Sequence, residues 1–184
     1  PGGQGSMTEE AAAALADADY VIGSGRMLDL ARGKKPILDE YRSAVIAHYI
    51  DTHRAYERFA VLLSGDTGFY SGAKKLADIL KKDGYEVQIF PGISSVIYLA
   101  AKLGKSWEDA KILSMHGRSQ NFIHVVANHE KTFLILGKSA GKEICEKLKY
   151  YHLEQVTVSV GNHLSYPDEE IVIKKGNELQ AEDF

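Results

Sequence analysis

The sequence predicts an α/β protein in which short strands alternate with helices. Short apolar runs alternate along the chain with segments that have the hydrophobic spacing of helices. Several apolar runs end in small turn-forming residues, as at Gly65 and Asp66 and again at Gly161 and Asn162. The 184 residues are 45% hydrophobic, which is enough for one good core or for two small lobes that share an interface.

The first half of the chain is expected to contain three helices and three strands. An alanine-rich run predicts a helix over 10–16, and Ser6 and Glu9 have the spacing of a capping box before it. Apolar residues with helical spacing predict a helix over 43–58 and another from Tyr70 to about Lys82, before Asp83 and Gly84. Apolar runs predict strands over 19–22, 59–63 and 86–90.

The second half follows the same alternation. Helices are expected over 96–103 and 142–150, and strands over 111–114, 132–136, 156–160 and 171–174. The residues after Gly176 are polar and are expected to fray. The composition shifts near Pro91, which predicts two α/β lobes, 1–90 and 91–184.

Composition excludes several classes of function. The net charge of −3 gives no bulk field for nucleic acid. The single Cys145 excludes an intramolecular disulfide and a cysteine-rich zinc site, and the histidine spacing does not indicate a protein metal site. No apolar run approaches a membrane span and no signal peptide is recognisable, so a cytoplasmic location is expected.

A Gly-rich turn over 64–72 follows the predicted strand 59–63 and is the most informative segment. Ligands of α/β sheets bind outside the carboxyl ends of strands, where such turns lie. The turn has no P-loop lysine, and the dinucleotide fingerprint that begins at Gly23 fails at Leu28. Asp66 is therefore either an acceptor for some other ligand or the N-cap of the next helix.

Three sequence blocks identify the chain as similar to the tetrapyrrole methylases, S-adenosylmethionine-dependent enzymes of corrin and sirohaem synthesis. They are residues 64–71 (SGDTGFYS), 91–95 (PGISS) and 160–169 (VGNHLSYPDE). The last block, together with 114–118 (SMHGR), most resembles the members that methylate C5 of a precorrin or cobalt-precorrin ring in cobalamin biosynthesis.

The resemblance implies a two-lobed tetrapyrrole methylase fold that holds S-adenosylmethionine between the lobes. It makes Pro1 and Gly2 the end of the family's first glycine-rich loop, so the strand before that loop is expected to be missing from this chain; an artificial extension is the alternative. Phe69 is either a wall of the donor site or a core residue of the next helix. The implied donor-binding residues are Pro1, Gly2, Gly65, Asp66, Thr67, Phe69, Ser94, Ser95, Gly137, Gly161 and Asn162.

The implied second substrate is a corrin-type ring that carries acetate and propionate groups. Arginine binds carboxylates well, so Arg118 and then Arg26 are the candidate contacts, with a solvated surface arginine as the alternative for each. His116 is the candidate for moving a proton after methylation, unless it is a structural histidine. The ring carbon can itself attack the methyl group, so no protein nucleophile is needed.

The resemblance also implies a homodimer, with a decarboxylating C15-methylase as a possible partner. Two other functions stay open. The chain could methylate a different target within the superfamily, or it could bind donor or ring without catalysis and depend on a partner methylase.

Overall fold

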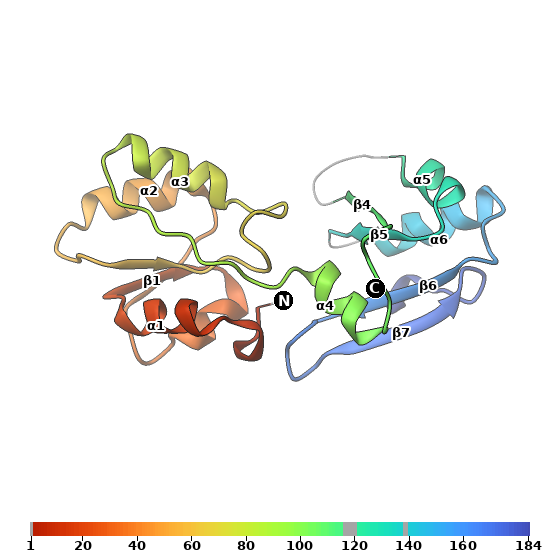
Figure 1. Ribbon diagram of the computed structural model, residues 1–184, viewed down its shortest axis with the longest axis horizontal. Coiled ribbons are helices and arrows are strands. Elements are labelled where there is room, and N and C mark those ends of the chain that lie inside the picture. The colour runs from red at the N-terminus through yellow and green to blue at the C-terminus, as the bar shows by residue number, and fades with distance from the viewer. Residues whose placement is uncertain (1, 116–120, 138–139) are drawn as a thin grey trace. The chain divides into compact units, whose positions relative to one another are not determined.

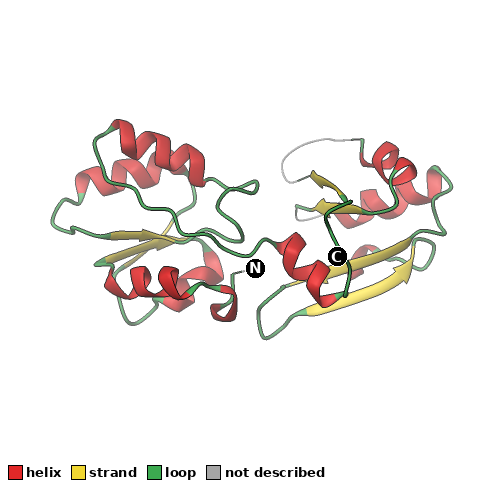
Figure 2. Cartoon of the chain, viewed as in Figure 1, coloured by secondary structure: helices red, strands yellow, loops and turns green. Residues whose placement is uncertain are grey.

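The computed structural model describes residues 2–115, 121–137 and 140–184. The chain forms two compact units, Pro1–Ser95 and Val96–Phe184. Helices and strands alternate in both units, as Figures 1 and 2 show. The α/β class expected from the sequence is confirmed.

The first unit is built on a parallel three-stranded sheet in the order β2 (Ile37–Asp39), β1 (Tyr20–Gly23), β3 (Phe59–Val61). Helices α2 (Ser43–Thr52) and α3 (Ala73–Lys82) lie on one face of this sheet and α1 (Glu9–Asp17) on the other (Figure 1). Two short 3₁₀ helices complete the unit: η1 (Gln4–Ser6) and η2 (Gly25–Leu30).

The core of the first unit lies between the sheet and helices α2 and α3. The central strand β1 is buried along its whole length, as expected for a parallel strand covered on both faces. The Tyr20 ring packs against Tyr49, whose hydroxyl group donates a hydrogen bond of 2.8 Å to that of Tyr20. The buried residues of this core are Tyr20, Ile22, Ile46, Ala47, Ile50, Leu76 and Leu80.

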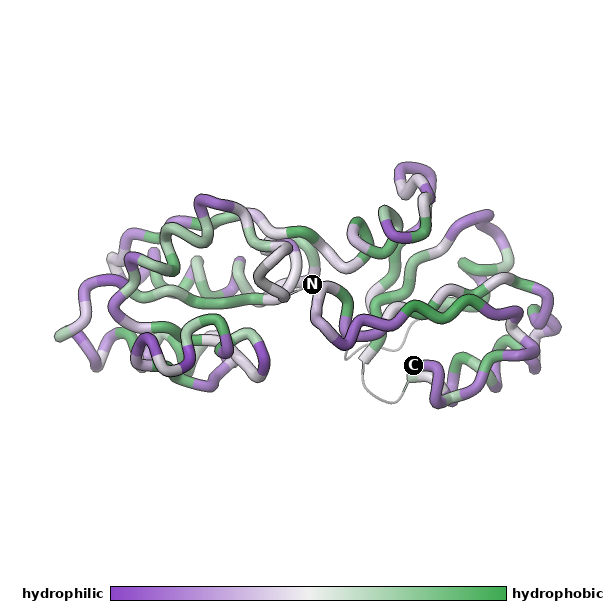
Figure 3. Tube along the Cα trace, turned by 90° about the horizontal axis from the view of Figure 1, so that it is seen from below, coloured by the Kyte–Doolittle hydropathy of each residue, from purple (hydrophilic) through white to green (hydrophobic). Residues whose placement is uncertain are grey.

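Within its described residues, the second unit contains two small sheets and one hydrophobic core. Strands β4 (Lys111–Ser114) and β5 (Thr132–Ile135) are parallel, whereas β6 (Thr157–Asn162) and β7 (Glu170–Lys175) form an antiparallel pair. Its helices are α4 (Ser95–Lys102), α5 (Phe122–Asn128), α6 (Ala140–Tyr150) and η3 (Ala181–Asp183). Hydrophobic and hydrophilic stretches alternate along the chain in both units (Figure 3).

Several predicted elements differ from the structure. The helix expected over 43–58 ends at Thr52, and residues 86–90 form no strand. The first helix is capped by Thr8, whose Oγ1 accepts a 3.2 Å hydrogen bond from the Ala11 N–H, and not by Ser6. The sequence analysis also missed β2 and α5, which are too short for a clear periodic pattern.

Candidate functional site

The carboxyl ends of β1, β2 and β3 lie at one edge of the sheet, because the three strands are parallel. The loops that follow them begin at Ser24, Glu40 and Leu62. This edge is where open α/β sheets bind ligands. The glycine-rich turn over 64–72 therefore lies where the sequence analysis expected a ligand site.

A close approach of two backbone segments joins the turn over 64–72 to residues 91–95. A Cβ atom on Gly92 would lie 2.3 Å from the carbonyl oxygen of Gly65, so no residue with a side chain fits at 92 without displacing backbone. Gly65 has a φ of +76°, which favours glycine, and its own Cβ would come within 3.8 Å of the Ser94 Cα. The structure thus brings two of the three sequence blocks into contact.

Asp66 forms a turn and does not cap the following helix. Its Oδ1 accepts a hydrogen bond of 2.7 Å from the Gly68 N–H. The N-cap of α3 is Gly72, and the Ala73 N–H donates to the Ser71 hydroxyl group instead. The helix N-cap alternative for Asp66 is therefore wrong. Its second carboxylate oxygen, Oδ2, has no hydrogen-bond partner among the residues that the structure describes.

Phe69 and Tyr70 lie in the turn and outside α3. Their rings meet edge to face with centroids 5.0 Å apart, and Tyr70 is exposed with a φ of +51°. Tyr70 was expected on the buried face of the helix, but α3 begins only at Ala73. Phe69 belongs to none of the hydrophobic clusters among the described residues.

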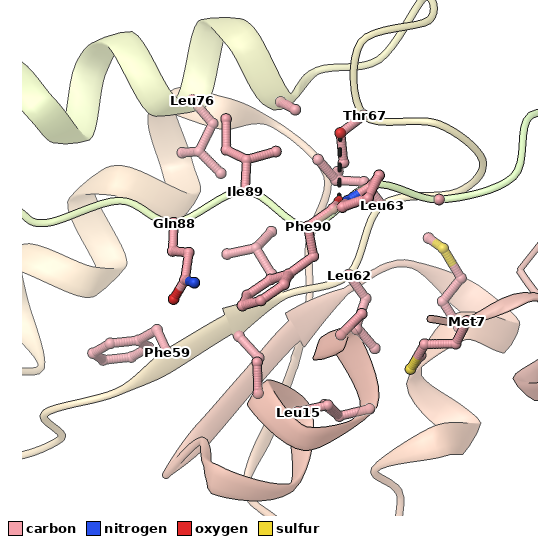
Figure 4. Close-up of a pocket in the computed structure, with 18 of the residues that line it drawn as sticks. Met7, Leu15, Phe59, Leu62, Leu63, Thr67, Leu76, Gln88, Ile89 and Phe90 are labelled. Atoms are coloured by element: carbon pink, nitrogen blue, oxygen red, sulfur yellow. Dashed lines mark hydrogen bonds between the residues drawn. The ribbon is translucent and has the colours of Figure 1, made fainter. Parts of the chain in front are cut away.

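Four further donor-site candidates lie in or near this turn. The Thr67 hydroxyl group donates a long hydrogen bond of 3.5 Å to the Phe90 carbonyl oxygen, which ties the turn to the segment before Pro91 (Figure 4). Thr67, Gly65 and Gly2 line the same apolar cavity. Ser94 is buried and Ser95 is the first residue of α4.

The loop that follows β2 was not predicted from the sequence. Buried Glu40 accepts hydrogen bonds from the N–H groups of Tyr41 and Arg42 and from the Arg42 guanidinium, whose Nη2 lies 2.6 Å from Oε2. The hydrogen bond from the Arg42 side chain is the main reason that the pKa of Glu40 falls from 4.5 to about 2. Asp39 Oδ1 accepts a 3.3 Å hydrogen bond from the Gly25 N–H and so joins two of the loops. The sequence signal that could have predicted this loop is the pair of acidic residues, Asp39 and Glu40, at the end of a short apolar run.

Of the residues predicted to bind the ring or to move its proton, Arg26 lies within the described part of the chain. Arg26 is exposed in η2, directly after β1, and so lies on the same sheet edge as Asp66. Pro1, His116 and Arg118 lie outside the described residues.

In the second unit, Gly161 and Asn162 end strand β6, which extends two residues beyond the predicted strand. A Cβ on Gly161 would lie 2.9 Å from Leu164 Cδ2 and 3.1 Å from Leu99 Cδ1, so a side chain at 161 would displace the ends of these leucine side chains. Asn162 Nδ2 donates a 2.8 Å hydrogen bond to the Asp183 carbonyl oxygen. Gly137 follows the carboxyl end of β5.

Residues 163–169, within the third sequence block, form the turn between β6 and β7. Glu169 accepts a 2.7 Å hydrogen bond from the Ser165 N–H and pairs with Lys102 at 2.8 Å. The bond from Lys102 is the largest of the effects that lower the pKa of Glu169 to about 2. His163 and Ser165 have positive φ values of 47° and 73°. The hydrogen bond from the Ser165 N–H to Glu169 closes this turn.

Three further features concern a nucleophile, a metal site and a membrane-spanning helix. Cys145 is half-buried on α6, and burial raises the pKa of its thiol. Within residues 2–115, 121–137 and 140–184, no cluster of three His, Cys, Asp or Glu side chains could hold a metal ion. Across those same ranges no helix has the length and apolar character needed to cross a membrane.

Comparison with solved structures shows the same fold in tetrapyrrole-modifying enzymes. A uroporphyrin-III C-methyltransferase from Thermus thermophilus in complex with S-adenosylhomocysteine matches with a TM-score of 0.72 at 20% identity, over 97% of this chain and 86% of the other. The precorrin-6Y methylase of Archaeoglobus fulgidus matches with a TM-score of 0.64 at 22% identity, over 97% and 88% of the two chains.

Sequence relatives cover nearly the whole chain. The "Probable cobalt-precorrin-7 C(5)-methyltransferase" of Methanocaldococcus jannaschii is 31% identical over 193 aligned positions, covering 100% of this chain and 90% of the relative. The cobalt-precorrin-7 C(5)-methyltransferase of Salmonella typhimurium is 30% identical, over 93% and 85% of the two chains. The model of the Tetrapyrrole (Corrin/Porphyrin) Methylases matches residues 1–180. The chain therefore belongs to the tetrapyrrole methylase family, and it is a methyltransferase that uses S-adenosylmethionine as methyl donor.

Proposed function

We propose that this chain methylates C5 of a cobalt-precorrin ring in cobalamin biosynthesis. Two relatives that align along nearly the whole chain carry this activity in their names. The family membership supports methyl transfer, and the turn over 163–169 contains the sequence block most similar to the C5 enzymes.

The observation that carries the proposal is the contact between Gly65 and Gly92. It sets the turn over 64–72 against residues 91–95 at the carboxyl edge of the parallel sheet. Glycines in both loops allow a ligand to approach backbone groups closely at this end of the sheet. Asp66 Oδ2 is available there to accept a hydrogen bond from a hydroxyl or amino group of the donor.

The reaction needs alignment more than it needs a reactive side chain. A ring carbon attacks the methyl carbon, the C–C bond forms as the S–C bond breaks, and neutral S-adenosylhomocysteine leaves. The ring then loses a proton. Positioning the two substrates in line supplies much of the rate enhancement in such a step. The half-buried Cys145, with its raised pKa, fits a structural role.

The remaining roles follow the family resemblance. Pro1, Gly2, Thr67, Phe69, Ser94 and Ser95 complete the donor-binding set in the first unit, and Gly137, Gly161 and Asn162 contribute from the second. Arg26 and Arg118 bind ring carboxylates, and His116 receives or passes on the released proton. The enzyme works as a homodimer in the cytoplasm, and a decarboxylating C15-methylase acts on the same ring.

The first test is calorimetric titration of the protein with S-adenosylhomocysteine, with NAD and ATP as controls. We expect selective micromolar binding of S-adenosylhomocysteine. Incubation with S-adenosylmethionine and cobalt-precorrin-7 should then add one methyl group, which NMR of the product locates at C5.

The outcomes separate the proposal from its alternatives. Methylation at another ring position would replace the C5 assignment by a different target within the family. Donor binding without transfer, in a folded protein supplied with ring, would indicate a binding subunit. If S-adenosylhomocysteine does not bind to a folded protein, the donor site itself is refuted.

A further inference from the structure

The loop that follows β2 holds an arginine side chain in a fixed orientation. Glu40 lies directly after the strand, and its side chain is only 9% exposed. Its carboxylate accepts hydrogen bonds from Arg42 Nε at 3.0 Å and 3.2 Å, and from Arg42 Nη2 at 2.6 Å. The same carboxylate accepts from the N–H groups of Tyr41 and Arg42, which fixes it against the backbone. The guanidinium of Arg42 is therefore held at the carboxyl edge of the parallel sheet.

The other edge of this guanidinium is accessible to solvent. Glu40 engages the N–H group of Nε and one N–H group of Nη2. Among the described residues, none accepts a hydrogen bond from Arg42 Nη1, and the Arg42 side chain is 64% exposed. Nη1 and Nη2 can therefore bind a second carboxylate together while Glu40 holds the first edge. Because the pair with Glu40 is neutral as a whole, this binding depends on two directed hydrogen bonds more than on net charge.

The helix that begins here gives no reason for an arginine at position 42. Arg42 is the N-cap residue of α2, but its side chain forms no capping hydrogen bond. Its contribution to the helix comes from its carbonyl oxygen, which accepts from the N–H groups of Val45 and Ile46. Arginine has no acceptor atom with which to cap a helix, and a positive charge is unfavourable at the N-terminal end of the helix dipole.

Exposed hydrophobic side chains accompany Arg42 at this edge of the sheet. Tyr41, the residue before it, is 71% exposed, and Val45 is exposed on the first turn of α2. Tyr70 is exposed in the turn over 64–72, where its φ of +51° is unusual for a bulky residue and keeps it out of α3. We refer to Tyr41, Arg42, Val45 and Tyr70 as the arginine–tyrosine patch.

The two loops that carry the patch approach each other at the start of α2. Helices α2 and α3 lie side by side on one face of the sheet (Figure 1). A Cβ atom on Gly72, two residues after Tyr70, would lie 3.8 Å from the hydroxyl oxygen of Ser43, the residue that follows Arg42. The end of the turn over 64–72 therefore lies beside the first residue of α2. The patch thus occupies the same sheet edge as Asp66, the proposed contact for the methyl donor.

From these observations we infer that the arginine–tyrosine patch binds the ring substrate. Arg42 donates two hydrogen bonds to one carboxylate at the rim of the ring, and Tyr41 packs against the conjugated macrocycle. A corrin combines an apolar conjugated body with carboxylates at its rim, and a fixed guanidinium beside exposed aromatic rings is complementary to both. The inference rests on the proposed function, because that function makes a corrin the ligand. It adds Arg42 to Arg26 and Arg118 as a contact for the ring.

Equilibrium binding of two stable corrins, with S-adenosylhomocysteine present, tests the inference without methyl transfer. Cobyrinic acid carries free carboxylates at its rim, whereas cobinamide carries amides in their place. Arg42→Ala should weaken the binding of cobyrinic acid about tenfold and lower kcat/KM for cobalt-precorrin-7 to a similar extent, because charged hydrogen bonds to a carboxylate are lost. Arg42→Lys should have nearly the same effect, since lysine keeps the charge beside Glu40 but offers no second edge. Neither variant should change the binding of cobinamide beyond error.

A substitution of the aromatic part of the patch should behave differently. Tyr41→Ala should weaken the binding of both corrins about threefold, because packing against the ring does not depend on carboxylates. Arg54→Ala is the matched control: Arg54 also pairs with a carboxylate, that of Asp51, but it lies between α2 and the start of β3, at the opposite edge of the sheet. It should leave the Kd of both corrins unchanged. Urea denaturation establishes that each variant is folded.

The outcomes separate this inference from the proposed function. Methylation of the ring with equal kcat/KM in the parent and in Arg42→Ala would overturn the inference and leave the proposed function intact. Binding of cobyrinic acid that depends on Arg42, without methyl transfer, would support the patch and refute the activity. A folded parent that does not bind cobyrinic acid would overturn the inference. So would a loss of S-adenosylhomocysteine affinity in Arg42→Ala, which would assign the patch to the donor, or a change in solution mass, which would assign it to an interface between copies.

Discussion

Single residues decide whether the loops at the carboxyl ends of the parallel strands can come together. Gly92 and Gly65 touch through their backbones, and the available space rather than flexibility alone requires glycine at 92. Asp66 uses one carboxylate oxygen to shape its own turn, and the proposed role of the other is to accept a hydrogen bond from the methyl donor. The role argued for Gly92 is therefore in the shape of the backbone, and the role proposed for Asp66 is in donor binding as well. Substitutions test each role.

Gly92→Ala should destabilise the first unit and weaken donor binding. The added methyl group would meet the Gly65 carbonyl oxygen at 2.3 Å, so backbone must shift, at a cost of about 1–3 kcal/mol in the free energy of unfolding. Urea denaturation and titration with S-adenosylhomocysteine measure the two effects.

Gly5→Ala is the matched control, because its Cβ would meet no atom of the described residues within 4 Å and Gly5 lies in η1, outside the turn over 64–72. It should leave stability and binding within error of the parent. Equal behaviour of the two variants would show that the close approach at Gly92 does not matter.

Substitutions of Asp66 distinguish a ligand contact from a turn former. Asp66→Asn keeps an oxygen for the Gly68 N–H but removes the negative charge, whereas Asp66→Ala removes both. We expect both variants to lose about 1.5–3 kcal/mol of S-adenosylhomocysteine binding, roughly tenfold to hundredfold in Kd.

Only Asp66→Ala should also reduce stability, and Asp78→Ala, on the exposed face of α3, should change neither property. Full affinity in Asp66→Asn would leave Asp66 with the turn as its only role.

At the scale of elements, carboxylates organise the loops that follow strands. Glu40 gathers the backbone and side chain of Arg42 directly after β2, and Glu169 ties Ser165 and Lys102 around the turn between β6 and β7. Both glutamates accept hydrogen bonds from charged donors, and the pKa of each falls to about 2. The loops are therefore held by ionised carboxylates, which makes their stability depend on pH.

Glu40→Gln should flatten the acid dependence of stability. The folded-state pKa of Glu40 is about 2 and its ordinary value is 4.5, so its contribution is complete above pH 4.5 and is lost as the pH falls toward 2. The variant should be less stable than the parent at pH 7, and this difference should shrink between pH 4.5 and pH 2.

Denaturation across this pH range, with Glu10→Gln on the exposed side of α1 as control, checks the prediction. A difference between parent and Glu40→Gln that is constant with pH would contradict it.

At the scale of the whole molecule, the chain combines two α/β units of different sheet type. The first unit has a parallel sheet, with the loops proposed to bind the donor at the carboxyl ends of its strands. In the described part of the second unit, a parallel and an antiparallel pair of strands share a hydrophobic core. Family membership extends over both units, since the family model matches residues 1–180.

The proposed homodimer predicts a mass in solution of twice 20.3 kDa. Light scattering coupled to size-exclusion chromatography measures this mass directly, and a dilution series tests whether the dimer persists. A mass of 20.3 kDa at every concentration would remove the homodimer from the proposal.

The sequence by itself determined the fold class and the family, and it contained the two loops that we propose bind the methyl donor. Apolar runs and helical spacing depend on local pattern, which is why β1, α3 and α6 were predicted near their observed positions. The blocks at 64–71 and 91–95 were recognised as sequence, but only the tertiary structure brings Gly65 against Gly92.

Tertiary contacts also decided what local pattern could not. Residues 86–90 have the sequence of a strand but lack a paired neighbour among the described residues, because a strand is defined by its hydrogen-bonding partner. Asp66 has the residue type of a helix cap, yet the position at which α3 begins gives it a turn to close instead. Pattern along the chain specifies which elements can form, and packing between distant segments specifies which of them do.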